Sequence, residues 1–136
     1  MCDVHLRDAS VSRHHAEILR EGDSWVIADL GSGTGVLAIA AKKLGSGETF
    51  ACDFDPFAVA VGIRNIERNG TPDILMKEQD VLKWKPRKKG YDVVLANLFS
   101  TILIEAWPVI AKSLAPGGDL IVSGILEIGR ASCRER

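Results

Sequence analysis

The chain has 136 residues, of which 46% are hydrophobic, and this suffices for one domain with a buried core. Lys and Arg number 17 against 18 Asp and Glu, a balance that argues against a protein that binds nucleic acid directly. The three cysteines lack the paired spacing of a zinc site or a disulfide framework, the N-terminal residues are too polar for a signal peptide, and the apolar runs are too short to span a membrane. We therefore expect a cytoplasmic protein with no metal site and no membrane partner.

From Trp25 onward, segments with the composition of strands and helices alternate, which is typical of a parallel sheet with helices on its faces. The first expected strand, residues 25–29, is a short apolar run that ends at a glycine-rich turn. A helix over residues 36–44 follows and stops at Gly45, and residues 49–53 form the second expected strand. The next helix has Asp55 as its N-cap and ends at Asn69-Gly70.

The second half of the chain continues the alternation. A third strand is expected over residues 74–77 and a fourth over residues 91–97. The basic cluster between them is interpreted as a solvated loop, with a binding patch as the alternative; it consists of Lys83, Lys85, Arg87, Lys88 and Lys89. Residues 100–114 have a helical pattern, but Pro108 predicts either a kink or the start of a second helix. Pro116-Gly117-Gly118 predicts a turn into a fifth strand at residues 120–123.

The turn after the first strand has the spacing of a site for a nucleotide-like cofactor. Gly31, Gly33 and Gly35 follow the strand directly, so the backbone can approach a ligand beside a helix N-terminus. Val36 stands where the dinucleotide pattern has its third glycine, which disfavours nicotinamide cofactors. Asp53 ends the second strand 22 positions after Gly31, close to the roughly 20 expected for an acidic residue that accepts both ribose hydroxyls.

Two further polar residues follow strands of the same sheet. Asp80 lies just after the third strand, where its carboxylate could accept the adenine amino group; a solvated turn aspartate is the alternative interpretation. Asn97 ends the fourth strand, and the carboxyl ends of the first and fourth strands should form the switch-point crevice of such a sheet. We expect Asn97 beside the reacting end of the cofactor, with a turn or helix-capping role as the alternative.

Four different motifs lie at the ends of expected strands: Asp29-Leu30-Gly31-Ser32-Gly33-Thr34-Gly35, Asp53-Phe54-Asp55-Pro56, Ala96-Asn97-Leu98 and Ser123-Gly124-Ile125-Leu126. Together they resemble the ribosomal protein L-eleven methyltransferases, a family of class I S-adenosylmethionine-dependent methyltransferases. The resemblance covers about residues 26–127. The glycine motif is shared by many class I methyltransferases, whereas the other three are more selective.

The resemblance implies an α/β fold: a Rossmann-like class I methyltransferase core with a mainly parallel sheet of order 3-2-1-4-5, truncated before the last two strands of the family. It implies S-adenosylmethionine as the cofactor, and methyl transfer to amino groups of a protein substrate, mainly lysines of a ribosomal protein. Transfer to a neutral amine needs proximity and desolvation more than a base, so no catalytic residue is assigned. The expected cofactor-binding residues are Asp29, Gly31, Gly33, Gly35, Asp53, Asp80 and Asn97.

The start of the chain resembles a different family. Ser12-Arg13-His14-His15 and Trp25-Val26-Ile27, followed by the first residues of the glycine turn, are similar to part of a forkhead-associated domain, a phosphothreonine-binding module. In that module residues 25–28 pair antiparallel with residues 16–20, whereas in the methyltransferase sheet the same strand has both edges occupied. The two arrangements exclude each other, and the methyltransferase has the larger core.

We therefore expect three segments: a forkhead-associated-like fragment at residues 1–24 that is not an independent domain, a methyltransferase core at residues 25–128, and a non-native tail at residues 129–136. The first segment is expected to be a loose appendage or a short helix beginning near Ser12, joined to the core as a chimera within the glycine turn. A phosphothreonine peptide is a disfavoured partner. The alternatives to a protein methyltransferase are a phosphothreonine-binding module and a non-functional chimeric fragment.

Overall fold

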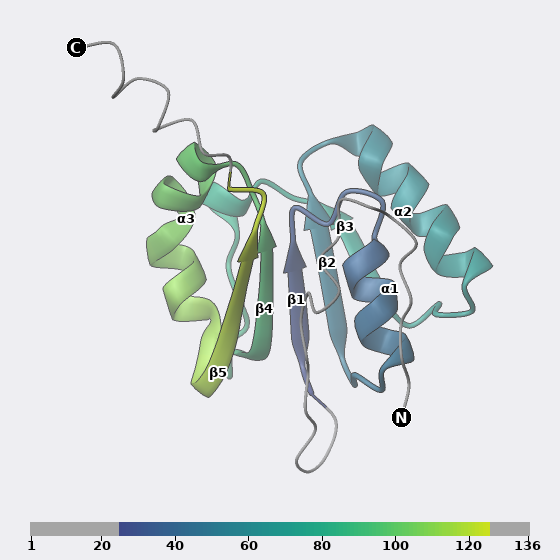
Figure 1. Cartoon of the computed structure of the whole chain (residues 1–136), viewed down its shortest axis with the longest axis horizontal. Coiled ribbons are helices and arrows are strands. Elements are labelled where there is room, and N and C mark those ends of the chain that lie inside the picture. The colour runs from purple at the N-terminus through teal and green to yellow at the C-terminus, as the bar shows by residue number, and fades with distance from the viewer. Residues whose placement is uncertain (1–24, 126–136) are drawn as a thin grey trace, which may run out of the picture.

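The computed structural model describes residues 25–125, which form a five-stranded sheet with helices on both faces (Figure 1). The strand order is β3-β2-β1-β4-β5, and every pair of neighbouring strands is parallel. This confirms the Rossmann-like sheet expected from the sequence. The strands are β1 (Ile27–Leu30), β2 (Thr49–Asp53), β3 (Leu75–Glu78), β4 (Tyr91–Asn97) and β5 (Leu114–Ser123).

Helices α1 (Val36–Lys43) and α2 (Pro56–Arg68) cover one face of the sheet, and α3 (Ser100–Ser113) covers the other (Figure 1). On the first face, Ala38 and Ile39 of α1 pack with Ile66 of α2 and with Ala51 of β2. A second cluster joins α3 to β1 and β4 and includes a short 3₁₀ helix, η1 (Val81–Lys83). Within residues 25–125 no helix is both long and apolar enough to cross a membrane.

Strand β1 is the centre of the sheet. Ile27 lies opposite Thr49 of β2 on one side and Val93 of β4 on the other, and all four residues of β1 are buried. An antiparallel partner would need a free edge, which β1 does not have. The forkhead-associated interpretation therefore gains no support from this strand, while Ser12, Arg13 and the helix expected near them lie outside the described residues.

In the last part of the fold the structure excludes one of two alternatives and corrects one expectation. Helix α3 continues through Pro108 to Ser113, so of the two alternatives at this proline the second helix is excluded. Proline cannot donate to the carbonyl of Ile104, and because Ile104 is exposed, water can hydrate that carbonyl instead. The expected turn at Pro116-Gly117-Gly118 lies inside β5, which starts directly after α3. The strand has a bulge there: Tyr91 of β4 lies opposite Leu114, but Val93, only two residues later, lies opposite Asp119.

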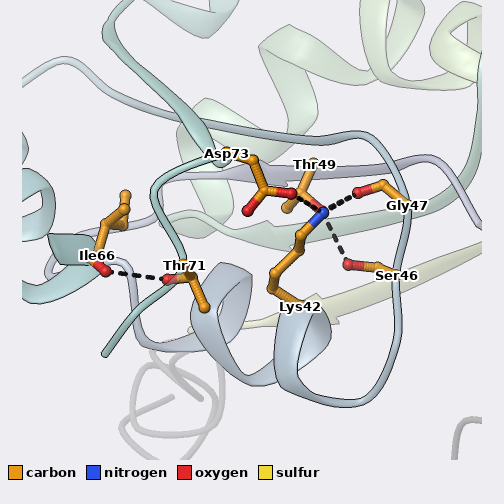
Figure 2. Close-up of polar contacts among 7 residues, drawn as sticks. All are labelled: Lys42, Ser46, Gly47, Thr49, Ile66, Thr71 and Asp73. Carbon is orange, nitrogen blue, oxygen red and sulfur yellow. Dashed lines mark hydrogen bonds and ion pairs between the residues drawn. The ribbon is translucent and has the colours of Figure 1, made fainter. Parts of the chain in front are cut away.

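One polar cluster fixes α1 to the two loops that precede β2 and β3 (Figure 2). Lys42 near the end of α1 forms an ion pair with Asp73 and donates to the carbonyl of Gly47 at 2.6 Å. Ser46 and Thr49 share a hydrogen bond of 2.8 Å beside it. The lysine side chain is mostly buried, so its charge needs these partners, which connect the end of α1 to the loops before β2 and β3.

Candidate functional site

The carboxyl ends of β1 and β4 approach each other closely at Gly31. This glycine has a φ of 70°, and a Cβ atom added to it would lie 2.3 Å from the carbonyl oxygen of Asn97 and 2.9 Å from a methyl carbon of Leu98. Only glycine satisfies both the backbone conformation and the spacing. The expectation that the turn after β1 faces the end of β4 is confirmed.

Asp53 at the end of β2 holds the glycine turn from the other side. Its Oδ2 accepts a hydrogen bond of 2.9 Å from the N–H of Gly33, and its Oδ1 accepts one of 2.9 Å from the N–H of Asp55. Each carboxylate oxygen retains further lone-pair positions, so the carboxylate can still accept from a ligand. A Cβ atom at Gly33 would meet nothing within 4 Å, which leaves room beside the turn for a ligand to approach.

Gly35 converts the turn into helix α1. It is the N-cap, in a left-handed conformation with a φ of 80°, and its carbonyl accepts the N–H of Ile39 at 2.9 Å. A Cβ atom there would lie 3.6 Å from the Cα of Gly62 in α2, so the turn is also packed against the second helix. The N-terminus of α1 therefore lies at the glycine turn, where it favours negative charge.

Asp29 lies beneath the turn and is fully buried, with 0% of its surface exposed. Its Oδ2 accepts a hydrogen bond of 3.1 Å from the N–H of Ala38. Burial raises its pKa from 3.8 to about 7; the Ala38 hydrogen bond opposes this rise, and the nearby charge of Asp53 adds to it. Among residues 25–125 neither its Oδ1 nor the Oγ of Ser32 has a hydrogen-bond partner.

Asp80 and Asn97 occupy the neighbouring strand ends. Asp80 is the N-cap of η1: its Oδ1 accepts a hydrogen bond of 2.9 Å from the N–H of Leu82, and its side chain is partly exposed. Asn97 is exposed and pairs in register with Ser123 of β5. The structure thus brings Asp29, the three glycines, Asp53 and Asn97 to one edge of the sheet, and it places Asp80 at the same edge, after β3.

Sequence reasoning missed several residues that shape this edge. The side-chain amide of Asn65 in α2 donates to the carbonyl of Thr34 at 3.0 Å and ties the turn to that helix. Three phenylalanines, Phe54, Phe57 and Phe99, are largely exposed close to the ends of β2 and β4. Single exposed apolar side chains are ordinary, but several near one edge of a sheet are informative. The segment Asp53-Phe54-Asp55-Pro56-Phe57 at a strand end would have been the signal for two of the three.

A parallel sheet of this order, with a glycine turn after β1 and an acidic residue ending β2, is the arrangement of Rossmann-like folds that bind nucleotide-like cofactors, a class that includes the class I methyltransferases. The chain belongs to the family described as ribosomal protein L11 methyltransferase (PrmA), which matches residues 12–136. That range includes Ser12 and Arg13 as well as the whole described core.

Curated relatives and solved structures agree with this family. A ribosomal protein L11 methyltransferase from Desulforamulus reducens is 35% identical over 135 residues, which are 99% of this chain and 43% of the relative. One from Photobacterium profundum is 44% identical over 104 residues, 75% of this chain and 34% of the relative. The crystal structure of ribosomal protein L11 methylase from Lactobacillus delbrueckii subsp. bulgaricus has a TM-score of 0.69 and 31% identity, covering 76% of this chain and 53% of that one.

A more distant structure shows the fold alone. A SAM-dependent methyltransferase from Geobacter sulfurreducens, in complex with S-adenosyl-L-homocysteine, has a TM-score of 0.65 at 19% identity and covers 73% of this chain and 41% of that one. The chain spans less than half the length of both curated relatives named above.

Proposed function

We propose that the chain binds S-adenosylmethionine at the carboxyl edge of β1, β2 and β4, and that it serves in methyl transfer to amino groups of a ribosomal protein in the cytoplasm. The observation that supports this most directly is the convergence at that edge: the turn at Gly31 touches the carbonyl of Asn97, and Asp53 reaches the N–H of Gly33. The named relatives are ribosomal protein L11 methyltransferases, and the Geobacter structure holds the demethylated cofactor product.

The residues at this edge fit such a cofactor. Asp53 has carboxylate lone pairs available for the ribose hydroxyls, and Asp80 could accept a hydrogen bond from the adenine amino group. The open space at Gly33 lets the cofactor approach the backbone of the turn. The buried Oδ1 of Asp29 lacks a partner among the described residues, and a nearby cationic ammonium group would satisfy it. The cofactor supplies a methyl group made electrophilic by its sulfonium sulfur.

The chain's own contribution to methyl transfer is positioning. Asn97 lies at the end of β4 next to Gly31, so its amide or carbonyl could hold an amino group in line with the methyl. A neutral amine needs no general base to attack, because its proton leaves to solvent after transfer. The exposed ring of Phe99, two residues further along, would help to exclude water from the acceptor.

The proposal is tested by calorimetric titration of the chain with S-adenosylhomocysteine. We expect saturable binding by the native chain and a loss of at least tenfold in affinity for Asp53→Ala, because the carboxylate that meets the ribose is removed. Asp119→Ala on β5 is the matched control and should bind as the native chain does. An absence of binding by the native chain, or equal binding by both variants, contradicts the proposal.

The acceptor is tested separately with isotopically labelled S-adenosylmethionine and bacterial ribosomal protein L11, and the label is located by mass spectrometry. Label on lysine or N-terminal amino groups supports the proposed substrate. If the chain binds the cofactor but transfers no label to this protein, the cofactor site stands and the proposed acceptor is wrong.

A further inference from the structure

The face of the sheet that carries α3 has a hollow over its β2–β3 half. Helix α3 packs on β4 and η1, and the connection from β3 to β4 consists of η1 and irregular residues rather than a full helix. The hollow has a volume of about 420 Å³ and is lined from β2, β3, β4 and that connection. It lies on the opposite face from α1 and α2 and shares no lining residue with the cofactor site described above.

The floor of the hollow is aromatic and apolar. Phe50 and Trp84 stack with parallel rings whose centroids are 5.7 Å apart, and Tyr91 leans against Trp84 at 5.7 Å with an angle of 34°. Trp84 and Tyr91 are buried, Phe50 is half-buried, and Leu75 at the side of the hollow is 53% exposed. A flat apolar group could therefore rest against Phe50 and Leu75, above the buried rings of Trp84 and Tyr91.

The rim carries four cations, Lys77, Lys83, Lys85 and Arg87, and no acidic residue is among the described residues that line the hollow. Arg87 lies 5.9 Å above the ring of Tyr91 and pairs with Glu48 at 2.7 Å. The ammonium of Lys83 is 4.0 Å from Asp80, a loose contact for a side chain that is 83% exposed. Lys77 and Lys85 have no ion pair among residues 25–125, so at least half of the rim charge is available to an anion.

We propose that this hollow binds single-stranded RNA, with one base against Phe50 and Leu75 and the flanking phosphates on the lysines of the rim. Single-strand sites combine a positively charged path for the backbone with an aromatic platform for bases. Lysine binds phosphate as a point charge, and two more exposed lysines, Lys88 and Lys89, follow Arg87 directly in the chain. Several cations around an aromatic floor match a polymer that carries both regularly spaced charges and flat bases better than they match an acidic peptide, which has no bases.

The net charge of −1 does not conflict with this site, because it is an average over the whole surface. The composition of residues 83–89 predicts a solvated loop, because the sequence alone does not place these residues next to Lys77 or above an aromatic floor. The fold brings the two segments together. The proposed RNA contact is independent of methyl transfer and is measured without the cofactor.

Fluorescence anisotropy of a labelled 12-nucleotide oligouridylate tests the site. Lys77→Glu combined with Lys85→Glu should weaken binding at least tenfold, and the slope of log affinity against log salt should become shallower by about 1.4, since each phosphate contact contributes about 0.7 for a single strand. Lys43→Glu combined with Lys112→Glu changes the net charge equally at exposed positions of α1 and α3 and should change the affinity less than twofold. Circular dichroism melts verify that both variants are folded.

Two further measurements separate the alternatives. Leu75→Ser keeps the charge and should weaken RNA binding several-fold if a base rests on the floor; an unchanged affinity contradicts the base contact. A poly-glutamate peptide is the competitor. The proposal is overturned if this peptide displaces the oligonucleotide at equal charge concentration, if the two charge-reversal variants behave alike, or if the native chain does not bind the oligonucleotide at 50 mM salt.

Discussion

The buried carboxyl group of Asp29 should make the free energy of unfolding depend on pH by an amount that can be calculated. Its pKa is about 7 in the folded protein against 3.8 for the ordinary side chain, chiefly because burial disfavours the charged form. A folded state that holds its proton more tightly than the unfolded state loses stability as the pH rises from 3.8 toward 7. At 1.36 kcal/mol per pKa unit, a shift of about three units costs about 4 kcal/mol at pH values above 7.

The substitution Asp29→Asn removes this titration. The amide oxygen can still accept from the N–H of Ala38, while the new NH₂ group lies where Oδ1 has no partner among the described residues. That unpaired group has a constant cost of about 1–3 kcal/mol, so the absolute stability of the variant is a poor test. The pH dependence is a clean one: the free energy of unfolding of the variant minus that of the native chain should rise by roughly 3 kcal/mol between pH 4.5 and 7.5.

Urea unfolding at half-unit pH intervals measures this difference directly, and contributions from all other carboxyl groups cancel between the two proteins. Asp119→Asn, an exposed position on β5, is the matched control and should show a flat difference. A flat difference for Asp29→Asn as well would refute the claim that the buried carboxyl ionises at a cost. If Asp29 also faces the cofactor ammonium, the same variant should bind S-adenosylhomocysteine at least tenfold more weakly at pH 8. The ionised carboxylate would then lower the stability of the protein while raising its affinity for the cofactor.

Three other substitutions test single contacts. Gly31→Ala should cost more than about 2 kcal/mol in urea unfolding, because its Cβ would lie 2.3 Å from the carbonyl oxygen of Asn97 at a φ of 70°; a stability close to native would show that β1 and β4 can separate. Asp53→Asn should retain the fold but reduce the rise in melting temperature caused by S-adenosylhomocysteine, and an undiminished rise would exclude the ribose contact. Lys42→Met should lower stability at pH 7. Because Lys42 lowers the pKa of Asp73, this deficit should shrink as the pH falls through that pKa, and a deficit independent of pH would show that packing alone is lost.

The strands with uninterrupted apolar runs could be predicted from the sequence. The expected bounds of β2 and β4 agree with the structure at both ends, and those of β1 and β3 differ by one or two residues. Short buried strands are recognisable because both of their faces are apolar. Strand β5 was less predictable, since Pro116 and two glycines are typical of a turn but form a bulge that tertiary pairing with β4 holds in the sheet.

The main parts of the candidate site were predictable for a geometric reason. In a parallel sheet all carboxyl ends meet at one edge, so residues that end β1, β2 and β4 must be neighbours whatever their separation along the chain. The bonds between them were not predictable. That Asn65 would donate to the carbonyl of Thr34 depends on how α2 is rotated on the sheet, and that Asp29 would be fully buried depends on how α1 packs above it.

The connection from β3 to β4 contains the basic residues 83–89, whose place around the hollow could not be predicted from the sequence. Parallel strands are usually joined through a helix that covers the sheet, and here η1 with the irregular residues 84–87 replaces most of such a helix. Trp84, the C-cap of η1, is buried and stacks on Phe50, while its neighbours Lys83 and Lys85 are exposed. A buried aromatic residue between two exposed lysines therefore sets cations around an aromatic floor, which explains why residues typical of a solvated loop form the rim of a hollow.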